Sequence, residues 1–286
     1  MLEIRARKLS DTLGCEIRGA EISADMSDAD FKTIEDALHD HLVVIVRDQK
    51  VSPEGFVAFA KRFGRPEPHV IDQFHHKADP NILILSNRKN EQGEPIGLAD
   101  AGGYFHSDYS YLDVPARCTM LYAIEIPGDD AGTTFANQRQ AYDDLPEETK
   151  QKIDPLICRH YYANRDDLDE ESRTAASKLT GEQKAKMEWV RHPLVRRHPY
   201  TGRKSLYAVS GTSFGVEGMS DRDGVALLDE LKRHSTQPKY CYTPQYRPGD
   251  VIVWDNCSVL HRAPLLDPNR SRTLWRITVK EKGPTM

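Results

Sequence analysis

The sequence lacks several features that would place it in a specialised class of protein. No stretch approaches the run of about 18 apolar residues that a membrane-spanning helix requires. Its five cysteines are widely spaced and include no Cys-x-x-Cys pair, which argues against a disulfide framework and against a thiolate zinc site. Neither a P-loop nor a Gly-x-Gly-x-x-Gly motif is present, so nothing supports a nucleotide cofactor.

An excess of basic residues is also missing. The 286 residues include 39 lysines and arginines against 44 acidic residues, a net charge of −5. Nucleic acids and anionic membranes attract positively charged faces, so we expect neither as a partner. The N-terminal residues carry charges where a secretory signal needs an apolar run, which favours a cytoplasmic protein. Basic groups that matter to function must therefore be few and local.

The first third of the chain combines helix and strand patterns. Ser27 is a typical N-cap, and apolar residues follow it at helical spacing until a buried-strand pattern begins at 42–46. Ser52, with Pro53 behind it, opens a second helix, and Gly64 ends that helix. These signals predict two amphipathic helices beside a buried strand.

Beyond residue 81, short strand-like runs dominate. They are NILIL, CTMLYAIEI, PLICRHYY, HPLVRRH, KSLYAV, KYCYTPQY, DVIVW and RTLWRITV, with helices expected near 138–144 and 221–233. A parallel sheet would need strict strand–helix alternation, which this part of the sequence lacks. We therefore predict a mainly β fold with flanking helices, a double-sheet sandwich or jelly roll. The polar segment 166–186 has no apolar period, and we expect a mobile excursion there.

The first candidates for chemistry are His106, Asp108 and His261. Residues at i and i+2 of an extended segment point to the same side, so His106 and Asp108 can offer an imidazole and a carboxylate to one ion. His261, from a distant strand, would complete the 2-His-1-carboxylate arrangement of non-haem Fe(II) oxygenases. A His-x-Asp sequence also arises by chance in a chain with 11 histidines. The alternative is a plain His–Asp hydrogen bond at a strand end.

Two arginines downstream favour the metal site. On the last predicted strand, Arg272 and Arg276 lie on one face, roughly 13 Å apart at about 3.3 Å per residue. A forked, permanently charged guanidinium suits a carboxylate. The two arginines could hold two different anions on either side of the metal. An edge strand with a solvated basic face is the alternative.

A competing motif is Gly-x-Ser-x-Gly at 211–215, the pattern of the nucleophile elbow of serine hydrolases. Asp250 or Asp255, and then His261, follow Ser213 in the order that such a triad needs. The elbow requires a helix directly after the serine, whereas the next helix signal comes only after Ser220. A serine hydrolase therefore stays a minor alternative, as does a hydrolase with zinc in the predicted metal site.

With these residues in view, the chain resembles the taurine dioxygenase / 2,4-dichlorophenoxyacetate dioxygenase family of Fe(II)- and 2-oxoglutarate-dependent oxygenases. The resemblance runs over nearly the whole length. Its landmarks, in order, are VVIVRDQ at 43–49, FAKRFG at 59–64, HSDYSY at 106–111, AGTTFAN at 131–137, HPLVRRHPYTGRKSLY at 192–207, VIVWDN at 251–256, LHR at 260–262 and RTLWRIT at 272–278. The resemblance implies a double-stranded β-helix, which is a jelly roll, formed by a single domain over 1–286 with a mobile lid around 163–190.

The resemblance also implies roles for individual residues. His106, Asp108 and His261 would hold Fe(II), and Arg272 would grip the far carboxylate of 2-oxoglutarate with Thr134 as its partner. The family's Gly-Gly-Asp-Thr reads AGTT here, so a threonine is kept while its neighbours differ. The expected cosubstrates are 2-oxoglutarate and O2, and 2-oxoglutarate would leave as succinate and CO2.

For the substrate, the resemblance points to Arg276 and His69 as the groups that hold an anionic end. Gly102 stands where the taurine enzyme has an asparagine, and GRKSLYAVSG is closer to the phenoxyacetate branch. We therefore expect hydroxylation of a C–H bond of a small organic anion, an aryloxy- or alkyl-alkanoate or a sulfonate, rather than of taurine itself. We also expect a homo-oligomer, a dimer or a tetramer.

Overall fold

The computed structural model describes residues 4–99, 102–128, 132–162, 181–182, 188–209, 213–264 and 269–281. The helices are α1 (Asp28–His41), α2 (Pro53–Phe63), α3 (Gln138–Asp143), α4 (Glu147–Ile153), α6 (Asp221–Ser235) and the 3-10 helix η3 (Pro238–Tyr240). The strands are β1 (Arg5–Lys8), β2 (Cys15–Arg18), β3 (Val43–Val46), β4 (Arg65–Pro66), β5 (His75–His76), β6 (Asp79–Ser86), β7 (Ala116–Glu125), β8 (Thr134–Asn137), β9 (Ile157–His160), β10 (Val190–Pro193), β11 (Val195–Arg197), β12 (Lys204–Leu206), β13 (Ser213–Val216), β14 (Cys241–Tyr242), β15 (Val251–Asp255), β16 (Val259–Arg262) and β17 (Thr273–Lys280). The predicted lid, 163–190, lies outside the described residues except at 181–182 and 188–190.

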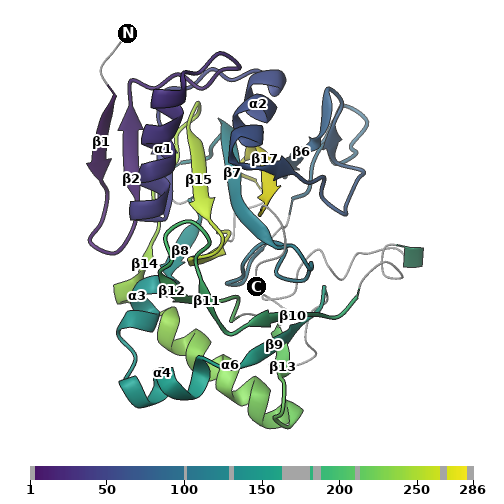
Figure 1. Cartoon of the computed structure of the whole chain (residues 1–286). Helices are drawn as coiled ribbons and strands as arrows, with labels where there is room; N and C mark the ends of the chain where they lie inside the picture. Colours follow the sequence, from purple (N-terminus) through teal and green to yellow (C-terminus); the bar gives the residue numbers. More distant parts are fainter. Residues whose placement is uncertain are drawn as a thin grey trace.

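The larger sheet has the strand order β1-β2-β3-β15-β7-β17-β6-β5, with β4 paired to β17. Its central pairs are antiparallel, and β2 and β3 form a parallel pair. Helices α1 and α2 cover one face of this sheet (Figure 1). Apolar side chains of both helices form a buried cluster with the sheet, and its members include Phe31, Ile34, Phe59, Phe63, Val44, Met120, Val253 and Ile277.

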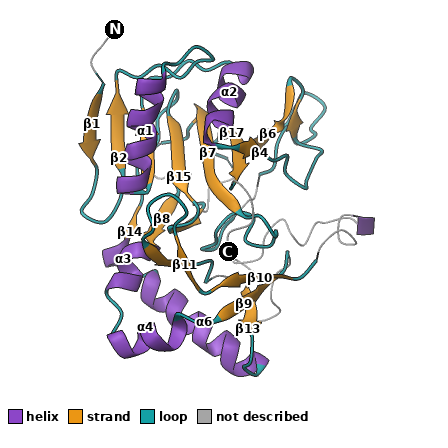
Figure 2. Cartoon of the chain, viewed as in Figure 1, coloured by secondary structure: helices purple, strands orange, loops and turns teal. Residues whose placement is uncertain are grey.

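Three smaller sheets complete the fold: β14-β8-β16, β10-β9-β13 and β11-β12. A second apolar cluster joins the larger sheet to β8 and β16, and it includes Leu121, Phe135, Trp254, Val259 and Leu274. Figure 2 shows that strands make up the interior, while the helices lie at its outside. Antiparallel sheets packed around a shared core confirm the predicted jelly roll with flanking helices.

The predicted helix caps are confirmed. The side chain of Ser27 accepts a hydrogen bond from the backbone N–H of Asp30, and Ser52 accepts one from Gly55. Helix α1 ends at His41, and Leu42 caps it with a left-handed φ of 66°, which lets the chain enter β3 at once. Every residue of β3 is buried, as the unbroken apolar run predicts.

Several strands differ from the sequence prediction in length. The run at 239–246 yields only the two-residue strand β14, because Pro238 begins a 3-10 turn and Pro244 has no N–H to donate. The apolar pattern does not predict α4 or the short strands β8, β13 and β16, and each of these strands pairs with a segment that is distant in the sequence. No helix in the described part of the chain is long and apolar enough to span a membrane.

Candidate active site

The structure brings the three predicted metal ligands together. His261 lies on β16, and the backbone of His106 pairs with it through two hydrogen bonds with N···O distances of 3.0 and 2.8 Å. The carboxylate of Asp108 faces both rings: Oδ1 is 3.7 Å from Nε2 of His106, and Oδ2 is 3.6 Å from Nε2 of His261. One ligand atom from each residue lies within 4.8 Å of the others.

The hydrogen bonding of His106 leaves Nε2 of its ring available to bind a metal ion. Its Nδ1 lies 2.8 Å from the carbonyl oxygen of Tyr104. Because a carbonyl can only accept, Nδ1 carries the ring hydrogen and Nε2 presents its lone pair. Burial lowers the pKa of both His106 and His261, so both rings are neutral, as metal ligands must be.

Asp108 stays ionised although it is buried. Burial is the largest single effect and by itself would raise its pKa, but the charge of Arg276, the two histidines and the hydrogen bond from Thr119 together outweigh burial, and the pKa lies below its ordinary value. Arg276 donates from Nη2 to Oδ1 across 2.6 Å, and the hydroxyl of Thr119 donates to Oδ2 across 2.6 Å. An ionised carboxylate beside two neutral imidazoles fits a divalent ion such as Fe(II) and leaves coordination positions for other ligands.

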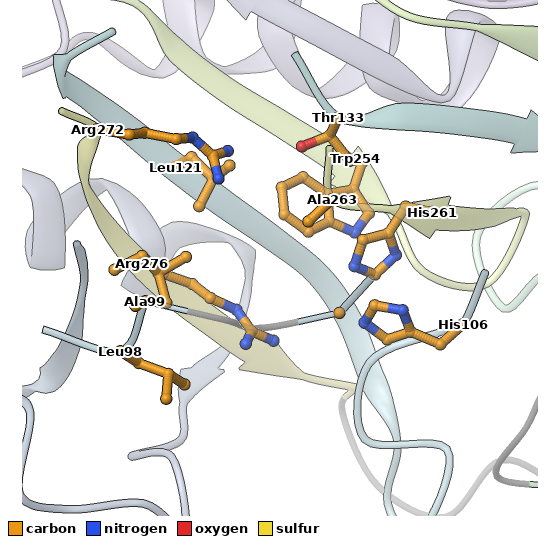
Figure 3. Close-up of a pocket in the computed structure, with 12 residues that line it drawn as sticks. Leu98, Ala99, His106, Leu121, Thr133, Trp254, His261, Ala263, Arg272 and Arg276 are labelled. Atoms are coloured by element: carbon orange, nitrogen blue, oxygen red, sulfur yellow. The ribbon is translucent and has the colours of Figure 1, made fainter. Parts of the chain in front are cut away.

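A cavity opens beside these residues. Figure 3 shows the guanidinium groups of Arg272 and Arg276 pointing into the space that the rings of His106 and His261 border. Arg272 is 9% exposed, and its Nε has no hydrogen-bond partner among the described residues. Burial lowers the pKa of Arg272, which means that its charge is poorly compensated. A buried guanidinium in this condition favours an anionic ligand in the cavity.

Of two adjacent threonines, the structure places Thr133 rather than the predicted Thr134 beside this cavity. The hydroxyl of Thr134 lies 2.8 Å from that of Thr243, and Thr134 does not border the cavity. Side chains alternate across a strand, and Phe135 shares a side with His261, on whose ring it stacks. Thr133 is on that same side, is buried, and borders the cavity (Figure 3). The role predicted for Thr134 therefore stays a prediction, and the geometry favours its neighbour Thr133 as the threonine that faces the cavity.

His69 lies on another side of Arg276. Both residues border a second, small cavity together with Tyr109 and Leu83. Nδ1 of His69 accepts a hydrogen bond from the backbone N–H of Ile71 at 3.1 Å, so its ring hydrogen is on Nε2. Burial, with the charge of Arg276, lowers the pKa of His69 to about 3, and the ring is neutral. Arg276 thus links the two cavities.

Aromatic and apolar side chains surround this region. The rings of Tyr111 and Tyr162 lie 4.2 Å apart between centroids, and those of Tyr109 and Tyr111 lie 5.9 Å apart. Tyr162 also packs against a small buried cluster that contains Leu83 and Leu98. A charged anchor with aromatic and apolar side chains nearby suits a small organic anion whose body is apolar.

Two further residues, Gly102 and Trp254, shape the site through contacts with the histidine rings, and the sequence did not predict these contacts. Gly102 has a φ of +76°, and a Cβ at this position would lie 2.5 Å from Cε1 of His106. Only glycine fits while the ring keeps its place. Trp254 borders the larger cavity and packs on His261, with ring centroids 4.7 Å apart. Two sequence features could have indicated these residues: a glycine shortly before the His-x-Asp motif and a tryptophan near the end of a buried strand.

The serine-hydrolase alternative is wrong. Ser213 lies within β13, where its hydroxyl donates to the carbonyl of Ala208 and lies 3.3 Å from Nδ1 of His160. The next helix, α6, begins well beyond the serine rather than directly after it. Asp255 lies 3.1 Å from Nε2 of His198 instead of orienting a catalytic imidazole beside Ser213.

Comparisons with known proteins agree with this geometry. A family model described as Taurine catabolism dioxygenase TauD, TfdA family matches residues 5–278. The alpha-ketoglutarate-dependent 2,4-dichlorophenoxyacetate dioxygenase of Burkholderia sp. (strain RASC) is similar, with 32% identity over 88% of this chain and 86% of its own length. Pentalenolactone F synthase of Streptomyces arenae is 30% identical over 93% of this chain and 91% of its own.

Solved structures show the same similarity. The crystal structure of AAD-2 in complex with Mn(II) and N-oxalylglycine has a TM-score of 0.80 and 28% sequence identity, and the match covers 100% of both chains. A taurine dioxygenase from Burkholderia xenovorans has a TM-score of 0.80 and 26% identity, and the match covers 98% of this chain and 90% of the other.

Proposed function

The chain belongs to the taurine catabolism dioxygenase TauD, TfdA family and is an Fe(II)- and 2-oxoglutarate-dependent dioxygenase; from this premise we propose which residues hold each component. His106, Asp108 and His261 hold Fe(II). The neutral state of both imidazoles, the ionised state of Asp108 and the convergence of their ligand atoms support this assignment. When bound, Fe(II) supplies the O2 chemistry that couples decarboxylation of 2-oxoglutarate to oxidation of a substrate C–H bond.

Arg272 holds the far carboxylate of 2-oxoglutarate, and Thr133 assists it. The observation that carries this assignment is the buried guanidinium, whose Nε has no hydrogen-bond partner among the described residues. A guanidinium fork matches a carboxylate with two parallel hydrogen bonds, and the hydroxyl of Thr133 can donate a third from across the cavity. Arg272 and the metal residues border the same cavity, so a short dicarboxylate can reach both.

Arg276 holds the anionic end of the organic substrate, and His69 donates to it from Nε2. Because Arg276 is bonded to Asp108, an anion on this guanidinium lies beside the metal residues. In that position, the C–H bonds nearest the anionic group of the substrate face the metal site. The nearby aromatic and apolar side chains contact the apolar part of the substrate and exclude water. The substrate is a small organic anion, an aryloxy- or alkyl-alkanoate or a sulfonate.

A substrate screen tests this function. Purified protein receives Fe(II), 2-oxoglutarate and air, and succinate release is measured with aryloxyacetates, alkanoates, alkylsulfonates and sulfate esters. We expect at least one class of anion to raise succinate release above the substrate-free rate. Product formation that needs neither O2 nor 2-oxoglutarate would instead support a metal-dependent hydrolase.

The remaining expectations belong to the same proposal. We propose a single domain over 1–286, in support of which Cys15, near the start of the chain, and Val279, near its end, share one buried cluster. We also propose a cytoplasmic location and a homo-oligomer, a dimer or a tetramer. Light scattering coupled to size-exclusion chromatography measures the oligomeric state directly.

A further inference from the structure

A line of hydrogen bonds leads through the core to the carboxylate of Asp108. Nε1 of Trp254 lies 3.1 Å from Oδ1 of Asn256, and Nδ2 of Asn256 lies 2.9 Å from Oγ1 of Thr119. Oγ1 of Thr119 lies 2.6 Å from Oδ2 of Asp108. All four side chains are buried, each at most 5% exposed. Solvent therefore competes little for any bond in the line.

The chemistry of the four groups fixes the direction of every bond. The indole N–H of Trp254 can only donate, so the atom of Asn256 that faces it must be the amide oxygen. The amide nitrogen of Asn256 therefore faces Thr119 and donates to it. The Thr119 oxygen is thus an acceptor on one side, and its single proton goes to the ionised carboxylate of Asp108. Each bond points toward Asp108, and donors aligned in this way reinforce one another.

Asn256 also holds the backbone around Asp108. Its Oδ1 lies 3.3 Å from the backbone nitrogen of Asp108, and its carbonyl oxygen accepts a hydrogen bond from the hydroxyl of Ser107 at 2.9 Å. At the other end of the line, the ring of Trp254 packs on His261. The same few side chains therefore contact both the carboxylate and one of the imidazoles.

We propose that Thr119 and Asn256 are positioning residues that hold the carboxylate of Asp108 in its metal-binding orientation before the metal arrives. This inference rests on the proposed function, since it takes Asp108 as a metal ligand. Without the hydroxyl of Thr119, Oδ2 loses its fixed donor, and the carboxylate must be ordered at the moment of binding. Outer partners of this kind change metal affinity by roughly 10–100-fold when they are removed.

The test measures Mn(II) affinity in the full-length protein, without 2-oxoglutarate or substrate, from the loss of the free-ion EPR signal. Thr119→Val removes the hydroxyl and keeps the shape, and we expect about 10-fold weaker binding. Thr119→Ser keeps the hydroxyl and should bind like the parent. Thr278→Val is the matched control, because Thr278 is also buried and its hydroxyl, which is not part of this line of hydrogen bonds, lies 3.3 Å from that of Thr119. It should leave Mn(II) affinity unchanged.

A second measurement distinguishes a positioning role from a general loss of structure. The visible absorption spectrum of bound Co(II) reports ligand geometry, and it should change in Thr119→Val and return in Thr119→Ser. Asn256→Ala should act in the same direction, and the double variant should lose less than the sum of the two single losses, because both substitutions break one line. Should Thr119→Val not fold, Thr119→Ala takes its place.

The outcomes separate this inference from the function on which it rests. If Thr119→Val binds Mn(II) like the parent, or if Thr278→Val weakens Mn(II) binding as much as Thr119→Val does, Thr119 and Asn256 do not position Asp108. The metal site itself would still stand. Failure of the parent protein to bind Mn(II) would overturn the metal site itself, and this inference with it.

Discussion

Arg276 and Asp108 form a buried ion pair, with 2.6 Å between Nη2 and Oδ1 and side chains that are 11% and 5% exposed. The residue that we assign to the substrate anion thus touches a residue that we assign to the metal. Arg272, four residues earlier, instead lies buried without a hydrogen-bond partner at Nε among the described residues. Two arginines next to one cavity therefore have different electrostatic surroundings, and this supports different ligands for the two.

Alanine variants of the two arginines should each weaken the binding of a different ligand. Arg276→Ala should raise the KM for the organic acid by roughly 10–100-fold, because a hydrogen bond to a charged group is worth about 1.5–3 kcal/mol. Arg272→Ala should weaken 2-oxoglutarate binding by a similar factor. Steady-state kinetics with each substrate varied in turn measures both. If each variant affects both substrates equally, the division of roles is wrong.

Two adjacent threonines provide a matched pair for the 2-oxoglutarate site. Thr133→Val should weaken 2-oxoglutarate binding by about 5–10-fold, since a hydrogen bond contributes about 1 kcal/mol and more when its partner is charged. Thr134→Val should leave that affinity unchanged, because the hydroxyl of Thr134 bonds to Thr243 instead. Isothermal titration under anaerobic conditions measures both. The reverse order would support Thr134, the residue predicted from the sequence, in place of Thr133.

Much of the fold follows from local pattern, and the threonine shows where local pattern stops. The caps at Ser27 and Ser52 and the apolar run of β3 depend on neighbouring residues, so the sequence predicts them. Thr133 and Thr134 are chemically identical neighbours, and only the pairing of β8 with β16 decides which one faces the cavity. The directed line to Asp108 likewise joins distant strands, which a sequence pattern cannot align.

Gly102 should be essential to the metal site for a steric reason. Gly102→Ala places a Cβ within 2.5 Å of the His106 ring, so we expect a large loss of Mn(II) affinity. Gly93→Ala is the control: Gly93 also has a positive φ, of +83°, but a Cβ there meets nothing within 4 Å. Both variants should lose about 1–2 kcal/mol of stability from the left-handed backbone. Equal metal affinities in the two variants would contradict the steric account.

Buried histidines should make the protein sensitive to acid. Burial lowers the pKa of His160 from 6.5 to about 3, so between these values the unfolded chain binds a proton that the folded chain does not. The free energy of unfolding therefore falls as pH falls below 6.5, by up to about 1.4 kcal/mol per pH unit for each such group. His69 and His192 add to this slope, with pKa values lowered to about 3 and about 4.

A variant isolates one contribution to that slope. The free energy of unfolding of the metal-free protein is measured with urea between about pH 4.5 and 6. His160→Gln should reduce its slope against pH by about 1.4 kcal/mol per pH unit, the contribution of one proton, whatever the effect of the substitution on stability at neutral pH. An unchanged slope would show that His160 is accessible to protons in the folded state.

The central claim is that His106, Asp108 and His261 hold Fe(II) with room for 2-oxoglutarate beside it. Its most direct test is the visible charge-transfer band that forms when Fe(II) and 2-oxoglutarate are added to the protein without oxygen. We predict a band in the parent protein, no band when succinate replaces 2-oxoglutarate, and no band in Asp108→Ala. A parent protein without the band, or an Asp108→Ala variant that keeps it, would contradict the account.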